Sequence, residues 1–355
     1  MNKKNMVLDK GTRYDNSQNT TRIVMLCDDS LMSRLFLSET FHICHQNKEF
    51  ELVLRVNTST QRNTHPPQVP KIINIIRLIK GNIGFKLLTE YFIEIINCQW
   101  RSRLLSKIPT HSPKDQNINS KSSISYIKSF SPDLILVMGC DQIISNNFLK
   151  QFPNKIVNFH WSLLPNHKGR GATLIPLLDG SKYTGVTYHT ITKDLDGGDI
   201  LDQHEFNLSN ITKQSQLHFV LIMTGIKSIR TFITKWHKKE LTPTPQKTND
   251  IKPITSKQLS KRYYLDPSLT AQQLVRRMQI MGYQIDPQSG LCITDLRISD
   301  FNQQNEFSSG EVISKSKKGI EIKVNSGSIL IKSFLYLPTV LSVKLWEKKN
   351  ISSKK

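Results

Sequence analysis

The residues best suited to chemistry in this 355-residue chain are an asparagine, a histidine and a distant aspartate. Asn158 and His160 alternate around Phe159, so they point to one face if this segment ends a strand. Asp196 follows His160 by 36 positions, in a glycine-rich turn. An asparagine amide can donate to an oxyanion, a histidine can move a proton, and an aspartate can orient the imidazole. Asn-x-His alone also fits a strand cap, so it is the aspartate that makes the trio suit acyl transfer to an amine from an activated donor.

The segments around this trio have the pattern of a doubly wound α/β domain. Apolar runs predict strands, and apolar residues at helical spacing predict the helices between them. The expected strands are 22–26, 52–56, 133–138 and 185–191, and the expected helices are 31–41, 120–130, 146–152 and 214–236. The segment carrying Asn158 stops at Pro165, which would leave its polar face at the mouth of the sheet, where such folds place their sites. The turn after the first strand lacks a G-x-G-x-x-G motif, which disfavours a dinucleotide there.

Charge and composition limit the partners. Hydrophobic residues make up 37% of the chain and charged residues 22%, as in ordinary globular proteins. The formal net charge of +21 favours an anionic partner such as nucleic acid, a phosphorylated ligand or an acidic membrane surface. A proteome-wide bias toward lysine and asparagine is the alternative. The five cysteines lack C-x-x-C spacing, so we expect no metal site and no disulfide framework; the chain fits a reducing, cytoplasmic compartment.

Composition also suggests domain boundaries. No apolar run in the insertion approaches the ~18 residues of a membrane span, and its lysines and arginines among apolar residues fit either a packed helical hairpin or a membrane-surface contact. After residue 250 the pattern changes to a capped helix and short β-like runs, typical of a small barrel. That part carries 17 Lys and Arg against 8 Asp and Glu. We expect a disordered leader 1–21, a catalytic domain 22–240 with a helical insertion at about 71–105, a linker 241–256, an OB-like β-barrel domain 257–345 and a basic tail 346–355.

The trio and its surroundings resemble the 10-formyltetrahydrofolate-dependent formyltransferases, which include methionyl-tRNA formyltransferase, glycinamide ribonucleotide formyltransferase and the sugar N-formyltransferases. The matching pieces occur in the family's order and approximate spacing, clearly from about 22 to 203. They are Asn158-Phe-His160, Ser162-Leu-Leu-Pro165 with Gly169, Gly180, Gly185-Val-Thr187 and Leu195-Asp196-Gly-Gly-Asp199. The resemblance implies a Rossmann-like parallel-sheet domain that uses 10-formyltetrahydrofolate as formyl donor and no metal.

The resemblance also implies roles for residues. Asn158 would polarise the formyl carbonyl and hold the tetrahedral oxyanion. His160 would act as general acid/base or as the cation beside that oxyanion, and Asp196 would orient it. The folate pterin would lie along the loop after the central strand and against the Asp196 turn, at Met138, Gly139, Asp141, Gln142, Ile143, Ile144 and Leu195. The loop on the acceptor side would contain Ser162, Leu163, Pro165, Lys168, Gly169 and Arg170.

The sequence leaves the acceptor open. The basic C-terminal part resembles the accessory domain of methionyl-tRNA formyltransferase and favours tRNA as the anionic acceptor. The methionyl-tRNA enzymes carry an aromatic-Arg-Gly-Ala-Ala-Pro run where residues 166–173 read NHKGRGAT, and this departure, with the 71–105 insertion, favours a nucleotide-linked amino sugar. A glycinamide ribonucleotide acceptor fits less well, because that enzyme type lacks a C-terminal domain. A formyl-folate hydrolase and an inactive homologue that binds RNA or a membrane surface are more distant alternatives.

Overall fold

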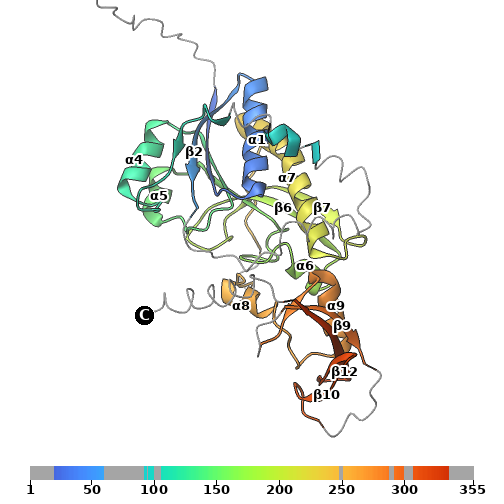
Figure 1. Ribbon diagram of the computed structural model, residues 1–355. Helices are drawn as coiled ribbons and strands as arrows, with labels where there is room; N and C mark the ends of the chain where they lie inside the picture. Colours follow the sequence, from blue (N-terminus) through green and yellow to red (C-terminus); the bar gives the residue numbers. More distant parts are fainter. Residues whose placement is uncertain are drawn as a thin grey trace, which may run out of the picture.

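The computed structural model describes residues 20–59, 92–93, 95–99, 105–247, 251–287, 292–299 and 307–335. Figure 1 shows a larger N-terminal part built on one sheet and a smaller C-terminal part below it. Most of the 71–105 insertion lies outside the described residues, as do the leader up to residue 19 and the tail. The predicted helical hairpin and its membrane contact therefore remain predictions.

The larger part contains a seven-stranded sheet of order β3-β2-β1-β4-β5-β6-β7. Its strands are β1 (Thr21–Cys27), β2 (Phe50–Asn57), β3 (Thr110–His111), β4 (Leu134–Met138), β5 (Ile156–His160), β6 (Tyr183–Thr190) and β7 (Ile200–Asn207). The first five strands pair in parallel, while β6 and β7 pair antiparallel. The predicted Rossmann-like α/β fold is thus confirmed for a mostly parallel sheet. Two antiparallel strands complete its edge: β6 runs antiparallel to β5, and β7 runs antiparallel to β6.

Helices cover both faces of this sheet (Figure 1). They are α1 (Leu31–Gln46), α4 (Lys121–Ser129), α5 (Asn146–Gln151), α6 (Ile175–Leu178) and α7 (Gln214–His237). α1 and α7 lie on one face, and α4 and α5 on the other. Successive strand residues alternate between the two cores: Ile23 and Met25 pack with α1 and α7, and Val24 and Leu26 with α4 and α5. Burial on both faces explains why the central strands are almost continuously apolar.

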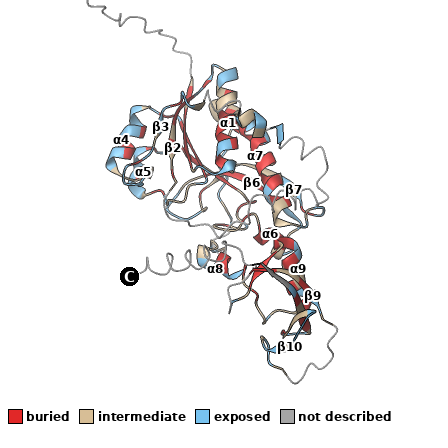
Figure 2. Cartoon of the chain, viewed as in Figure 1, coloured by how far each residue is buried: buried red, intermediate tan, exposed pale blue. Residues whose placement is uncertain are grey.

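Helix α7 has the only 18-residue window among the described residues that is long and apolar enough to cross a membrane. Within the protein, 61% of that window is buried. Leu217, Phe219, Leu221 and Phe232 contribute to the core shared with α1 and the sheet. The helix thus packs as a core element, shown as a largely buried stripe in Figure 2.

The C-terminal part is a small antiparallel sheet with helices beside it. It comprises α8 (Ser256–Lys261), α9 (Ala271–Met281), β8 (Gln284–Ile285), β9 (Cys292–Ile298), β10 (Val312–Ser316), β11 (Gly319–Lys323) and β12 (Ser328–Leu335). The Thr270 hydroxyl accepts from the Gln273 amide and the Gln273 side chain accepts from the Thr270 amide, so a capping box begins α9, the capped helix expected after residue 250. The strand order is β10-β11-β12-β9-β8. No ladder joins β10 to β8 among the described residues, so the sheet is present and its closure into an OB-like barrel is not established.

Candidate active site

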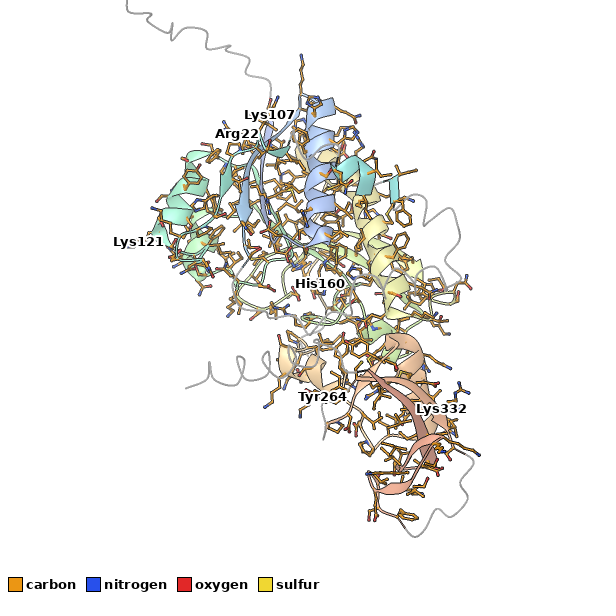
Figure 3. The ribbon with its side chains drawn as sticks, viewed as in Figure 1. Arg22, Lys107, Lys121, His160, Tyr264 and Lys332 are labelled. Atoms are coloured by element: carbon orange, nitrogen blue, oxygen red, sulfur yellow. The ribbon has the colours of Figure 1, made fainter. Side chains whose placement is uncertain are left out.

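Strand β5 presents two polar side chains on one face, as predicted. Val157 and Phe159 pack in the core with α1 and α7, so Asn158 and His160 project from the opposite face. Phe159 is wedged between Phe36 and Tyr188, with ring centroids 4.7 and 4.9 Å away. This aromatic packing holds the strand from behind. His160 lies at the end of the large sheet nearest the C-terminal part (Figure 3).

Asp196 is carried by a tight turn between β6 and β7. Its own φ of +51° is left-handed, which aspartate tolerates better than most residues. A Cβ added at Gly198 would lie 1.9 Å from the Thr190 carbonyl oxygen, so this position needs glycine. Gln246 Nε2 donates to the backbone oxygens of Asp196 and Gly198, at 2.9 and 2.7 Å. The turn therefore depends on two features: the absence of a side chain at Gly198, and the hydrogen bonds from Gln246 to its backbone.

The structure brings the predicted trio together. Asp196 Oδ2 lies 3.6 Å from His160 Nδ1, and Asp196 Oδ1 lies 3.5 Å from Asn158 Nδ2. The side chains of His160 and Asp196 are 8% and 9% exposed, so the carboxylate and the imidazole face each other largely out of water. His160 Nε2 donates to the carbonyl oxygen of His167 at 3.1 Å. The aspartate thus contacts both residues that the sequence pairs with it.

A second histidine that the sequence reasoning missed also belongs to this cluster. His189 on β6 is 2% exposed, and its Nε2 lies 3.0 Å from Asn158 Nδ2. Burial, the largest cause, lowers the pKa of His189 to about 4, despite the opposing effect of Asp196. The alternation along residues 185–191 indicates which face of the strand His189 occupies. Only the pairing of the strands shows that its partner is Asn158.

The segment predicted as a linker takes part in the site. Besides Gln246, Ile254 exchanges backbone hydrogen bonds with the loop after β5: its amide donates to Lys168 and its carbonyl accepts from Arg170. A Cβ added at Gly169, where φ is +79°, would lie 2.5 Å from the Ile254 oxygen. The Gly169 amide donates to Asp196 Oδ2 at 2.7 Å. The chain that leads to the C-terminal part therefore braces the backbone that holds the aspartate.

The residues predicted on the donor side follow β4 and differ in their surroundings. Met138 and Ile144 are buried in the two cores, whereas Ile143 and Leu195 are exposed by 76% and 52%. Gly139 has a φ of +63°, and a Cβ there would lie 2.8 Å from Ser33 Oγ on α1. The predicted donor-side residues thus include two exposed apolar side chains, whereas Gly139 is packed against Ser33.

Two further donor-side residues are engaged by the protein. Gln142 Oε1 accepts from the Ile118 amide at 3.0 Å, and its Nε2 donates to the Thr58 carbonyl at 3.4 Å. Asp141 Oδ1 accepts from Arg170 at 3.0 Å. Gln142 thus ties the loop after β4 to its neighbours, and Asp141 links that loop to the acceptor-side loop.

The acceptor-side loop is held close to β6. Ser162 is buried, its hydroxyl donates to the Asn166 carbonyl at 2.8 Å, and its own carbonyl accepts from Thr187 at 2.6 Å. The Leu164–Pro165 peptide is cis, and Leu163 is half-buried. Lys168 is 7% exposed and close enough to His189 to lower its pKa. The loop thus brings a buried cation to the edge of the trio.

No group of three or more His, Cys, Asp or Glu side chains with the geometry of a metal site occurs in the part of the chain that the structure describes. Asp196 lies within 3.7 Å of Asn158, His160 and His189, and Asn158 also contacts His189. This set of side chains is suited to proton transfer and oxyanion binding.

Comparison with known proteins identifies a formyl transferase domain at residues 100–218. The methionyl-tRNA formyltransferase of Finegoldia magna is 27% identical over 240 residues, which cover 67% of this chain and 77% of that protein. That of Buchnera aphidicola is 27% identical over 235 residues, covering 64% and 73%.

Two solved structures show a similar fold. A sugar 3N-formyl transferase solved with dTDP and 5-N-formyl-THF has a TM-score of 0.53 at 16% identity, over 90% of this chain and 99% of that one. An N-formyltransferase from Helicobacter canadensis, solved with folinic acid and dTDP-3-aminofucose, has a TM-score of 0.52 at 13% identity, over 89% and 100%.

Proposed function

Since this chain belongs to the formyl transferase family, we propose that it moves the formyl group of 10-formyltetrahydrofolate onto the amine of an aminoacyl-tRNA, as methionyl-tRNA formyltransferase does. The observation that carries the proposal is the contact of one buried carboxylate, Asp196, with both Asn158 and His160. The relatives with 24 to 28% identity are methionyl-tRNA formyltransferases. A cytoplasmic location goes with this acceptor.

The chemistry is a direct displacement at the formyl carbon. The acceptor nitrogen attacks that carbon, a C–N bond forms, and the carbonyl electrons move to oxygen. Asn158 donates an N–H to this oxyanion, which is worth most where water is excluded. His160, oriented by Asp196, would act either as the cation beside the oxyanion or as general acid/base, in which case it passes a proton to N10 of the folate as the old C–N bond breaks. As general acid/base, His160 takes one proton from the acceptor nitrogen and gives one to N10, so the products are the formylated amine and tetrahydrofolate with no net change in protons.

The donor would lie across the loop after β4. Its flat ring would contact Ile143 and Leu195, whose exposure otherwise leaves apolar surface in water. Gly139 lets Ser33 of α1 pack against the end of β4, because a Cβ there would lie 2.8 Å from Ser33 Oγ. The Gln142 and Asp141 side chains would hold the loop in shape through their contacts with Ile118 and Arg170.

A groove beside α9 supports an anionic acceptor. It has a volume of about 840 Å³ and includes no Asp or Glu among its lining residues. Lys182 precedes β6, Lys213 precedes α7 and Arg276 lies on α9, so three cations from separate elements surround it. Neutralised phosphates supply much of the affinity of proteins for RNA. We propose that this groove binds the phosphate backbone of the acceptor. We also propose that the C-terminal sheet is part of a basic OB-like domain.

The loop after β5 supports a second acceptor, a nucleotide-linked amino sugar. Residues 166–173 differ from the run that the methionyl-tRNA enzymes carry at this place. Within this loop, Arg170 forms an ion pair with Asp141 of the donor-side loop. The ion pair ties the altered loop to the donor-side loop, and the departure from the methionyl-tRNA pattern favours a small acceptor over a macromolecule.

One experiment tests the function and chooses the acceptor. Purified full-length protein is incubated with 10-formyltetrahydrofolate and either methionyl-tRNA or a panel of nucleotide amino sugars, and products are identified by mass. We expect formyl-methionyl-tRNA. Transfer to a sugar with none to tRNA would make the nucleotide amino sugar the acceptor in place of tRNA.

The Asn158→Ala variant tests the site itself. Loss of an oxyanion donor should reduce the rate ~10²- to 10³-fold. Asn147→Ala, at an exposed position on α5, is the matched control and should keep wild-type activity. Full activity of Asn158→Ala would refute the assigned roles.

A further inference from the structure

The structure gives Asn158 a partner that the trio does not include. His189 stands directly opposite Asn158 in the antiparallel register of β5 and β6, so the two side chains share one face of the sheet. The Asn158 Nδ2 to His189 Nε2 distance of 3.0 Å is that of a hydrogen bond. Which atom donates follows from the other side of the imidazole.

The second ring nitrogen fixes the tautomer. His189 Nδ1 lies 2.8 Å from the Thr190 carbonyl oxygen, which can only accept, so Nδ1 carries the proton. The charged groups near the ring are Asp196, His160 and Lys168; burial outweighs the carboxylate and keeps the pKa of His189 well below 7. At neutral pH Nε2 is therefore a bare lone pair. It can only accept, so the Asn158 amide must donate to it.

This hydrogen bond decides which way the Asn158 amide faces. With Nδ2 toward His189, the second amide hydrogen remains on the same nitrogen, near Asp196 Oδ1 at 3.5 Å, which is longer than an ordinary hydrogen bond. The Asn158 carbonyl oxygen points the other way. A flipped amide would bring that oxygen toward His189 Nε2 and Asp196 Oδ1, so three acceptors would meet in a buried site.

We propose that His189 is a positioning residue that locks the Asn158 amide with an N–H, and not its oxygen, available to the formyl oxygen of the donor. The inference rests on the proposed formyl transfer and deepens it. The second N–H of Asn158, which lies at a long distance from Asp196, then donates its hydrogen bond to the oxyanion as the oxyanion forms. Without His189 the amide can rotate, and the flipped rotamer repels the developing negative charge. His189 then acts on the rate only through Asn158.

Kinetics test the coupling through a double-mutant cycle. His189→Leu removes the acceptor at similar volume, and His189→Gln restores an acceptor oxygen. We expect His189→Leu to lower kcat about 10- to 100-fold with little change in the KM for the donor, part of the ~10²- to 10³-fold cost of losing the donor outright, and His189→Gln to recover part of it. In an Asn158→Ala background, His189→Leu should cause no further loss. An equal loss in both backgrounds would overturn the proposal, as would full activity of a folded His189→Leu.

A second readout does not depend on activity. Nitrogen-15 NMR of imidazole-labelled full-length protein reports which ring nitrogen of His189 is protonated between pH 8 and 5, with His189→Gln identifying its signals. A neutral ring protonated at Nδ1 supports the locked amide, and a ring protonated at Nε2 overturns it. If the wild type transfers no formyl group to any acceptor, the proposed function fails, while this measurement still decides the amide orientation.

Discussion

Acidification should destabilise this fold through His189. Burial lowers the pKa of this histidine from 6.5 to about 4, so the unfolded chain takes up a proton at a pH where the native state does not. The contribution of His189 to the free energy of unfolding is complete above pH 6.5 and is lost as the pH falls toward 4. Between pH 8 and pH 5 the loss in the free energy of unfolding is about 2 kcal/mol.

The assay is urea unfolding of the wild type and of His189→Gln at pH 8, 6 and 5. The variant should lose about 2 kcal/mol less than the wild type between pH 8 and pH 5, because its side chain does not titrate. His111 and His167, whose pKa values are also lowered by burial, are present in both proteins and cancel. His45→Gln, at an exposed position on α1, is the control. An equal loss in the free energy of unfolding between pH 8 and pH 5 for the wild type and His189→Gln would refute the reasoning.

Two other expectations concern the Asp196 turn and the groove. Gly198→Ala should lower kcat by about tenfold or more, since its Cβ must push the Thr190 carbonyl away and move the aspartate; unchanged kinetics in a folded variant would show that the turn tolerates the methyl group. Replacing Lys182, Lys213 and Arg276 by Gln should weaken tRNA binding and reduce the slope of log K against log salt by about 2 to 3. A slope equal to the wild type's would remove the groove from the acceptor site.

The sequence alone determined the chemistry-bearing strand and most of the sheet. Alternation around Phe159 placed Asn158 and His160 on one face, and the structure has them there, because side chains on a strand alternate whatever its neighbours are. The buried runs also predicted β1, β2 and β4, since a central strand must be apolar on both faces.

Only the tertiary structure decided who touches whom. Periodicity gives the face of a side chain but not the strand beside it, so His189 became the partner of Asn158 only when β6 paired antiparallel with β5. Gln246 and Ile254 lie in a stretch whose composition reads as a linker, yet their hydrogen bonds support the turn and loop around Asp196. Such backbone contacts depend on where distant segments meet, and local composition does not encode them.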